Sequence, residues 1–252
     1  MSTVWLVEAR RHLGPFAAAI TVGGLLGAAR LLFTPVTFDV FFQLFSMLAW
    51  TVLAGYAFSV VYGYFFLGRD VFLHLGHRSP ARATALKMAV QIAYLFMLFC
   101  WLLVFNALWM AHVGTDEMPV VLTYYVTARV ASLACFAAVV LAIIAVVKRI
   151  HGKTVALISA LVMYAVVTGG HAYLMWWMTH RGDTTWALGI ASDFPVVNQY
   201  ANILPMMIGS PTGTYADSVS PTSIALNVAV AVLGCGVWIA MTRRARLNFY
   251  RR

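Results

Sequence analysis

The sequence is poor in charge, and this scarcity excludes most classes of protein. Only 10% of its 252 residues are charged, against about 25% in soluble domains, while 62% are apolar. Its three cysteines, Cys100, Cys135 and Cys235, all fall within long apolar runs, which argues against a disulfide framework and against a thiol metal cluster. Long apolar runs recur along the sequence, which argues against a disordered chain, and proline and glycine follow no fixed repeat, which argues against a collagen-like one. The composition is that of an integral membrane protein.

The sequence instead contains six apolar runs of transmembrane length. A bilayer core about 30 Å thick needs about 20 helical residues to cross it. Transmembrane strands would alternate in polarity over segments of about 10 residues, whereas these runs are continuous, which favours helices. We therefore predict an all-α integral membrane protein in a single transmembrane domain, with spans at residues 15–33, 40–67, 88–111, 121–147, 154–178 and 222–242.

The basic residues divide unequally between the two sides of the predicted bundle. Fourteen of the 17 lie in the termini and in the connectors after spans two and four, together with two acidic residues. The other side has three basic and six acidic residues. Because lysines and arginines in short connectors stay cytoplasmic, we predict a multi-pass protein of the plasma (cell inner) membrane with both termini cytoplasmic. The net charge of +9 reflects this topology, and no nucleic-acid partner is expected.

Residues 1–14, before the first span, have an amphipathic pattern. Apolar residues from Trp5 to Phe16 recur on one face at helical spacing, while Glu8, Arg11 and His12 fall on another. This pattern favours an interfacial helix along the cytoplasmic leaflet, after which the chain turns into the membrane. An extended basic flank is the alternative.

Two connectors are predicted to carry structure of their own. The inner connector 68–87 has a short apolar stretch followed by Gly76 and Pro80, which is typical of a short helix, a turn and re-entry into the membrane at Lys87. The outer connector 179–221 is apolar, but each of its parts is too short to span. We therefore predict that it forms an outer cap of re-entrant or interfacial helices.

The sequence has no complete catalytic or cofactor motif. HExxH, GxSxG and acidic calcium-loop patterns are absent, and no two carboxylates are set for acid and base work. Residues 152–154 (GKT) match the end of a phosphate-binding loop, but Val147 stands where that loop requires glycine. His171 lies within a span and His112 at an outer boundary, which is too few for paired haem ligands. No catalytic, cofactor-binding or metal-ligating residue is predicted.

A layer of polar residues remains within the outer half of the spans. Buried ionisable side chains are costly and tend to line pathways, so the candidate pathway residues are Arg129, Asn106, His171 and Asn227. The alternative for an arginine is snorkelling to the outer interface. We favour snorkelling for Arg30, near the end of its span. Arg129 lies about 12 Å deep, which favours a position facing the interior or another subunit.

This arrangement resembles the membrane subunits of type-2 ATP-binding-cassette (ABC) transporters, which are mostly exporters. Those permeases are similar in length and have an interfacial helix, six spans, a coupling helix in the first inner loop and short outer helices between spans five and six. Within that loop, Ser79-Pro80-Ala81-Arg82 and the following Lys87 look like the family's Pro-x-Arg turn and its lysine at the start of span three.

By that resemblance, the chain forms the translocation pathway of an ATP-driven exporter for a hydrophobic or amphipathic substrate, such as a peptide, antibiotic or lipid. A second permease copy, identical or related, and a separate cytoplasmic ABC ATPase subunit that binds the ATP would be its partners. The resemblance assigns coupling to Arg69, Asp70, Phe72, Leu75, Arg78 and Arg82. Two alternatives stay open: a non-transport assembly or immunity factor, and a membrane-embedded enzyme, which the absent catalytic motifs disfavour.

Overall fold

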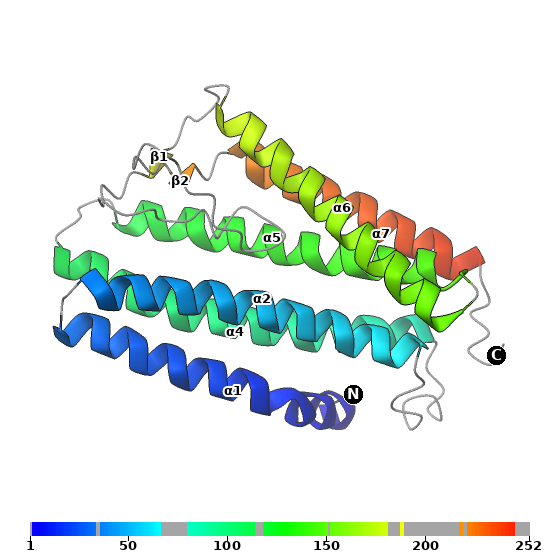
Figure 1. Ribbon diagram of the computed structural model, residues 1–252, viewed down its shortest axis with the longest axis horizontal. Coiled ribbons are helices and arrows are strands. Elements are labelled where there is room, and N and C mark those ends of the chain that lie inside the picture. Colours follow the sequence, from blue (N-terminus) through cyan, green and yellow to red (C-terminus); the bar gives the residue numbers. More distant parts are fainter. Residues whose placement is uncertain are drawn as a thin grey trace.

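The computed structural model describes residues 2–33, 36–66, 80–113, 118–150, 152–180, 187–188, 217–218 and 221–244. Six long helices make up nearly all of this part of the chain (Figure 1): α1, Ser2–Phe33; α2, Val36–Phe66; α4, Pro80–Val113; α5, Met118–Val147; α6, Lys153–His180; and α7, Pro221–Arg244. Each contains a segment long and apolar enough to cross a membrane. The predicted six-span helical architecture of a multi-pass membrane protein is therefore confirmed.

The helices alternate in direction, so both ends of the described chain lie at the same end of the bundle (Figure 1). The start of α1 and the end of α7 lie near the ends of α2 and α5 and the starts of α4 and α6. We call this the inner end, because the sequence predicts it to be cytoplasmic. The opposite end is called the outer end.

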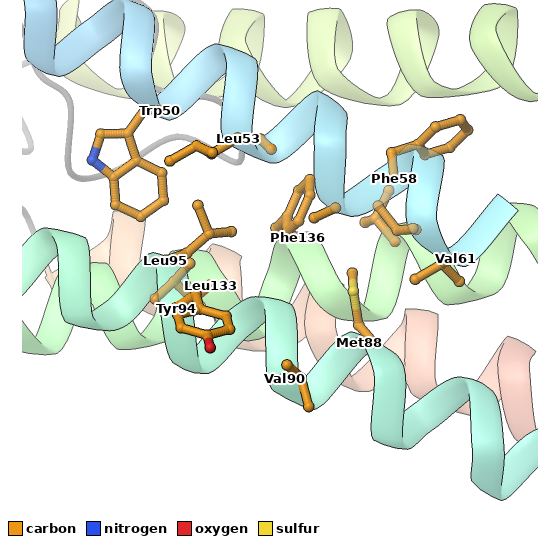
Figure 2. Packing of buried hydrophobic residues seen from close by; sticks show 14 of the residues in the cluster. Trp50, Leu53, Phe58, Val61, Met88, Val90, Tyr94, Leu95, Leu133 and Phe136 are labelled. Carbon is orange, nitrogen blue, oxygen red and sulfur yellow. The ribbon is translucent and has the colours of Figure 1, made fainter. Parts of the chain in front are cut away.

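The six helices pack as two groups. In the first group, α1, α2 and α4 all contact one another; in the second, α5 packs along α7 and also contacts α6. The groups meet where α5 contacts α4 and, over fewer residues, α2. Figure 2 shows the core at this meeting, where Leu53 of α2, Leu95 of α4 and Phe136 of α5 point toward one another.

The prediction that the first inner connector extends to Lys87 is wrong, because α4 begins at Pro80. Proline suits the first position of a helix, since its ring presets the backbone angle and the missing N–H would have no helical partner there. Arg82 and Lys87 therefore lie within α4. Of the predicted coupling residues only Arg82 is described, and the rest lie outside the described residues: Arg69, Asp70, Phe72, Leu75 and Arg78.

The predicted N-terminal interfacial helix is not a separate element. Helix α1 is continuous from Ser2 to Phe33 with Pro15 inside it, and Figure 1 shows its first turns bending away from the line of the rest. Proline bends a helix because its ring displaces the carbonyl one turn earlier and removes a hydrogen bond. The predicted helical conformation is present, whereas Glu8 and His12, predicted on an outward polar face, are buried.

The predicted outer cap 179–221 falls mostly outside the described residues. Its described part includes two short strands, β1 (Ala187–Leu188) and β2 (Asp217–Ser218), which pair antiparallel. This ladder brings the beginning and the end of the outer connector together. The prediction of re-entrant or interfacial helices concerns residues outside the described ranges.

Two glycines of α1 permit a close approach to its neighbours. A Cβ atom at Gly27 would lie 2.4 Å from the Cγ atom of Phe105 in α4, and one at Gly23 would lie 3.1 Å from both Phe45 and Leu102. The glycines are four residues apart and share one face of α1. Small residues at this spacing are typical of packed transmembrane helices, and here they accommodate large side chains of α2 and α4.

Candidate functional site

Arg129 lies inside the protein, where the two helix groups meet. Its side chain is only 1% exposed, and its guanidinium carbon lies 4.1 Å from the centre of the Trp50 ring of α2 and 5.4 Å from that of Phe99 in α4. A cation over aromatic rings is held more strongly where water is excluded. Arg129 follows the first residue of α5 by 11 positions, a distance of about 16 Å along the helix axis. This is an interior position deep in the bundle.

His171 of α6 and Asn227 of α7 are brought together in the second group. Both side chains are buried and lie near each other, and neither imidazole nitrogen makes a hydrogen bond with the described residues. Thr168, one turn before His171, is buried as well. Polar side chains that meet across a helix pair stabilise transmembrane packing. These two predicted pathway residues therefore contact each other, whereas Arg129 faces the rings of α2 and α4.

Asn106, the fourth predicted pathway residue, belongs to α4, and its side chain lies outside the described part of the structure. The structure thus divides the predicted polar layer between two places. One is the Arg129 position between the helix groups, and the other is the contact between α6 and α7. The role of this polar layer as a translocation pathway stays a prediction.

Arg30 does not snorkel to the outer interface, so the interpretation favoured for it is wrong. Its side chain is buried, and its guanidinium carbon lies 5.2 Å from the centre of the Phe42 ring of α2. Helices α1 and α2 pack together at this level, and Phe33 stacks on Phe38 beyond it. The neighbouring helix covers Arg30, which position within a single span cannot reveal.

A buried polar cluster at the inner end was not predicted. It consists of Glu8 and His12 of α1, Tyr56 of α2 and Lys87 of α4. The Glu8 carboxylate oxygen Oε1 accepts hydrogen bonds from Lys87 Nζ at 2.5 Å and from His12 Nε2 at 3.1 Å. On its other side the His12 ring is 2.7 Å from the Tyr56 hydroxyl through Nδ1. We call these four residues the inner polar cluster.

The inner polar cluster is reinforced by contacts around it. The Tyr94 hydroxyl of α4 donates a hydrogen bond of 2.7 Å to the Ala9 carbonyl, and the Tyr94 ring stacks on Phe16. Lys87 Nζ lies 5.2 Å from the centre of the Tyr64 ring. One sequence signal could have pointed here, because Glu8 is one of two acidic residues on the strongly basic inner side.

Lys148 marks the inner end of the second group. It follows the last residue of α5, and its ammonium lies 5.2 Å from the centre of the Phe66 ring at the end of α2. Burial lowers the pKa of Lys148 below its ordinary value, because desolvation disfavours the charged form. The contact ties the two helix groups together at this end.

Comparisons with protein-family models, curated proteins and solved structures find no match for this chain. Within the described ranges, no three His, Cys, Asp or Glu side chains are grouped so that they could hold a metal ion. The fold and the buried groups define a class, a six-helix membrane protein with an arginine buried between two helix groups and an ion pair at one end.

Proposed function

We propose that the chain is the pathway-forming membrane subunit of an ATP-driven exporter of the ABC type. The proposal rests on the layout that the sequence shares with type-2 permeases, with six spans, a helical N-terminal segment and a basic inner connector. The observation that supports it best is the buried position of Arg129 where α5 of one helix group meets α2 and α4 of the other. Alternating access needs a boundary between bodies that move relative to one another. A charged side chain at that boundary is suited to contact cargo.

The cargo is proposed to be hydrophobic or amphipathic, such as a peptide, an antibiotic or a lipid. Aromatic rings flank Arg129 on two sides, so a ligand reaching it would meet apolar surface together with one positive charge. A second permease copy, identical or related, is proposed to complete the pathway. The outer faces of α6 and α7 are apolar and exposed in the single chain, for example at Val166, Val232 and Leu233. Such faces suit lipid or another subunit.

The decisive experiment is purification of the tagged chain from its native membrane in mild detergent, followed by identification of its partners. We expect a cytoplasmic subunit with a complete GxxxxGK[ST] motif, which binds phosphates through its backbone N–H groups and lysine. Replacing that lysine with alanine should abolish ATP hydrolysis and preserve the complex, which makes it the matched control. Purification of the active chain without an ATPase would contradict the proposal, and turnover by the chain alone would favour an enzyme.

Arg82 offers a test of coupling within this chain. It is exposed in the first turns of α4, directly after the inner connector. If the connector docks on the ATPase, Arg82→Glu should weaken the complex or its ATPase stimulation, since a broken charge pair at an interface costs about 2–5 kcal/mol. Arg149→Glu, an exposed arginine at the inner end of the second group, is the matched control. Equal behaviour of the two variants would remove Arg82 from the coupling surface.

A further inference from the structure

The inner polar cluster has no part in the proposed pathway, although it joins three helices. Glu8 and Lys87 are 79 residues apart in the chain, and their side chains are 5% and 0% exposed. Both charged side chains are therefore shielded from solvent inside the bundle. Leu6, Val7 and Leu13, on the opposite face of the same turns of α1, are exposed. The first turns of α1 thus bury Glu8 and His12, while Arg10, Arg11 and several apolar side chains of the same turns are exposed.

Two contacts of the cluster link α1 to other helices, and a third joins two residues of α1. The Lys87 ammonium of α4 donates to Glu8 of α1, and His12, one turn later in α1, lies between Glu8 and Tyr56 of α2. A neutral imidazole with its proton on Nε2 satisfies both neighbours, because Nε2 donates to Glu8 and Nδ1 accepts from the Tyr56 hydroxyl. His12 therefore orients the Glu8 carboxylate toward Lys87.

Lys87 is also placed to transmit movement. It lies seven residues, about 10 Å, beyond Pro80, where α4 begins after the inner connector. A helix of this length is stiff, so a displacement of its first turn reaches Lys87. If α4 moved without α1, the Glu8 carboxylate and the Lys87 ammonium would be left buried and unpaired, which is strongly unfavourable.

We propose that the Glu8–Lys87 ion pair, oriented by His12 and Tyr56, fastens the N-terminal part of α1 to the start of α4, so that the inner ends of α1, α2 and α4 move as one body. The inference rests on the proposed function only in that a partner is taken to act on the connector before α4. The fastening itself is a property of this chain alone.

The test is a distance measurement between spin labels on the two fastened segments. Arg10 of α1 and Arg82 of α4 are both exposed, and each is replaced with a labelled cysteine after Cys100, Cys135 and Cys235 have been changed to alanine. The full chain is studied in lipid nanodiscs without a partner. With the ion pair intact, a single narrow distance distribution is expected, since the two segments form one body.

Glu8→Gln and Lys87→Met should each broaden the distribution and raise the ratio of separated to docked populations by about tenfold or more, because the remaining charge is left without its partner. Tyr56→Phe, which keeps the ring and removes one hydrogen bond, should have a smaller effect of the same sign. The exchanged pair, Glu8→Lys with Lys87→Glu, should be narrower than either single variant. Arg149→Gln removes an exposed charge elsewhere at the inner end and should change nothing.

A narrow, unshifted distribution in both Glu8→Gln and Lys87→Met would overturn the inference. Tyr56→Phe keeps the test valid if a charge variant fails to fold, since an unchanged distribution there would show that the hydrogen bond from Tyr56 to His12 does not help to fasten the segments. Because no ATPase is present, this result is independent of whether an ATPase co-purifies. The proposal that the ion pair fastens α1 to α4 can therefore fail independently of the exporter proposal.

Discussion

Arginines within a span are held either by water and headgroups at the surface or by the protein inside the bundle. Arg129 and Arg30 belong to the second kind, and each guanidinium lies over an aromatic ring of α2. Depth along the span was enough to favour an interior position for Arg129. The same reasoning failed for Arg30, because the helix that covers it is 12 residues away in sequence at Phe42 and its packing leaves no local pattern.

The guanidinium of Arg129 is expected to matter as a plane as well as a charge. It is weakly hydrated and can stack on Trp50, whereas a lysine ammonium is compact and strongly hydrated. We expect Arg129→Lys to lose about 1–2 kcal/mol of stability in thermal unfolding and to restore only part of the transport that Arg129→Ala loses. Both are measured in the reconstituted complex. Full activity of the alanine variant would remove Arg129 from the pathway.

Gln91 is a buried polar side chain whose polar atoms lack hydrogen-bond partners among the described residues. It is 0% exposed on α4, and neither atom of its amide finds a hydrogen-bond partner among the described residues. An unsatisfied buried amide costs about 1–3 kcal/mol. Gln91→Met keeps the shape without the polar group, so it should raise the unfolding temperature, and Gln91→Glu should lower it. A less stable methionine variant would show that the amide is satisfied in the membrane.

At the scale of the helices, hydropathy alone located all six spans. The length of an apolar run is dictated by the thickness of the bilayer, so the spans can be predicted from short stretches of sequence. The boundaries were less accurate. Arg82 and Lys87 were taken as connector because they are charged, yet both lie in α4, and Lys87 is neutralised by Glu8 from a distant helix. Pairing of this kind cannot be inferred from a window along one sequence.

The amphipathic pattern of the first turns of α1 was recognised, but its direction was misread. In water a helix turns its polar face outward, and the sequence analysis placed Glu8 and His12 on such a face. In the structure both are buried, while Leu6 and Leu13 are exposed. Where the surroundings are hydrocarbon, exposed apolar residues cost nothing and buried charges can pair. The periodicity alone does not show which polar residues are buried, and in the structure the partners Lys87 and Tyr56 hold Glu8 and His12 inside, while Arg11 is exposed.

The contact between α5 and α7 provides a matched pair of glycine variants. A Cβ atom at Gly234 would lie 2.9 Å from the Ala138 backbone of α5, whereas one at Gly236 would meet nothing within 4 Å. Backbone cannot yield as a flexible side chain can, so Gly234→Ala should separate the helices and cost about 1–3 kcal/mol. Gly236→Ala should be neutral or gain up to about 1 kcal/mol from helix propensity.

Thermal unfolding of both glycine variants in nanodiscs checks this difference. The two substitutions add the same methyl group to the same helix two residues apart, so lipid composition and helix propensity affect them equally. Equal unfolding temperatures would mean that α5 and α7 do not approach closely at Gly234. A fall for Gly236→Ala alone would place the other face of α7 in contact with a neighbour.

At the scale of the whole molecule, charge and geometry agree. The start of α1 and the end of α7 share one end of the bundle with the starts of α4 and α6 (Figure 1), and the sequence gathers most of its basic residues in the segments at that same end. The alternation of the helices explains why six spans return the chain to one side. Which side of the membrane this is depends on the charges, because the same alternation of helices is compatible with either orientation.

Orientation follows only from the charges, and thiol labelling in intact cells tests it. In a chain with Cys100, Cys135 and Cys235 replaced, a cysteine at Thr115 or Thr212 should react with an impermeant maleimide added outside, since both fall in connectors predicted to be external. A cysteine at Ser79 or Asn248 should react only after the cells are permeabilised, which also controls for its reactivity. Labelling of the cysteine at Ser79 and protection of the one at Thr115 in intact cells would reverse the predicted orientation. The Glu8–Lys87 pair would then lie at the extracellular end of the bundle. In that case no cytoplasmic ATPase could reach the connector before α4, so the same measurement also bears on the exporter proposal.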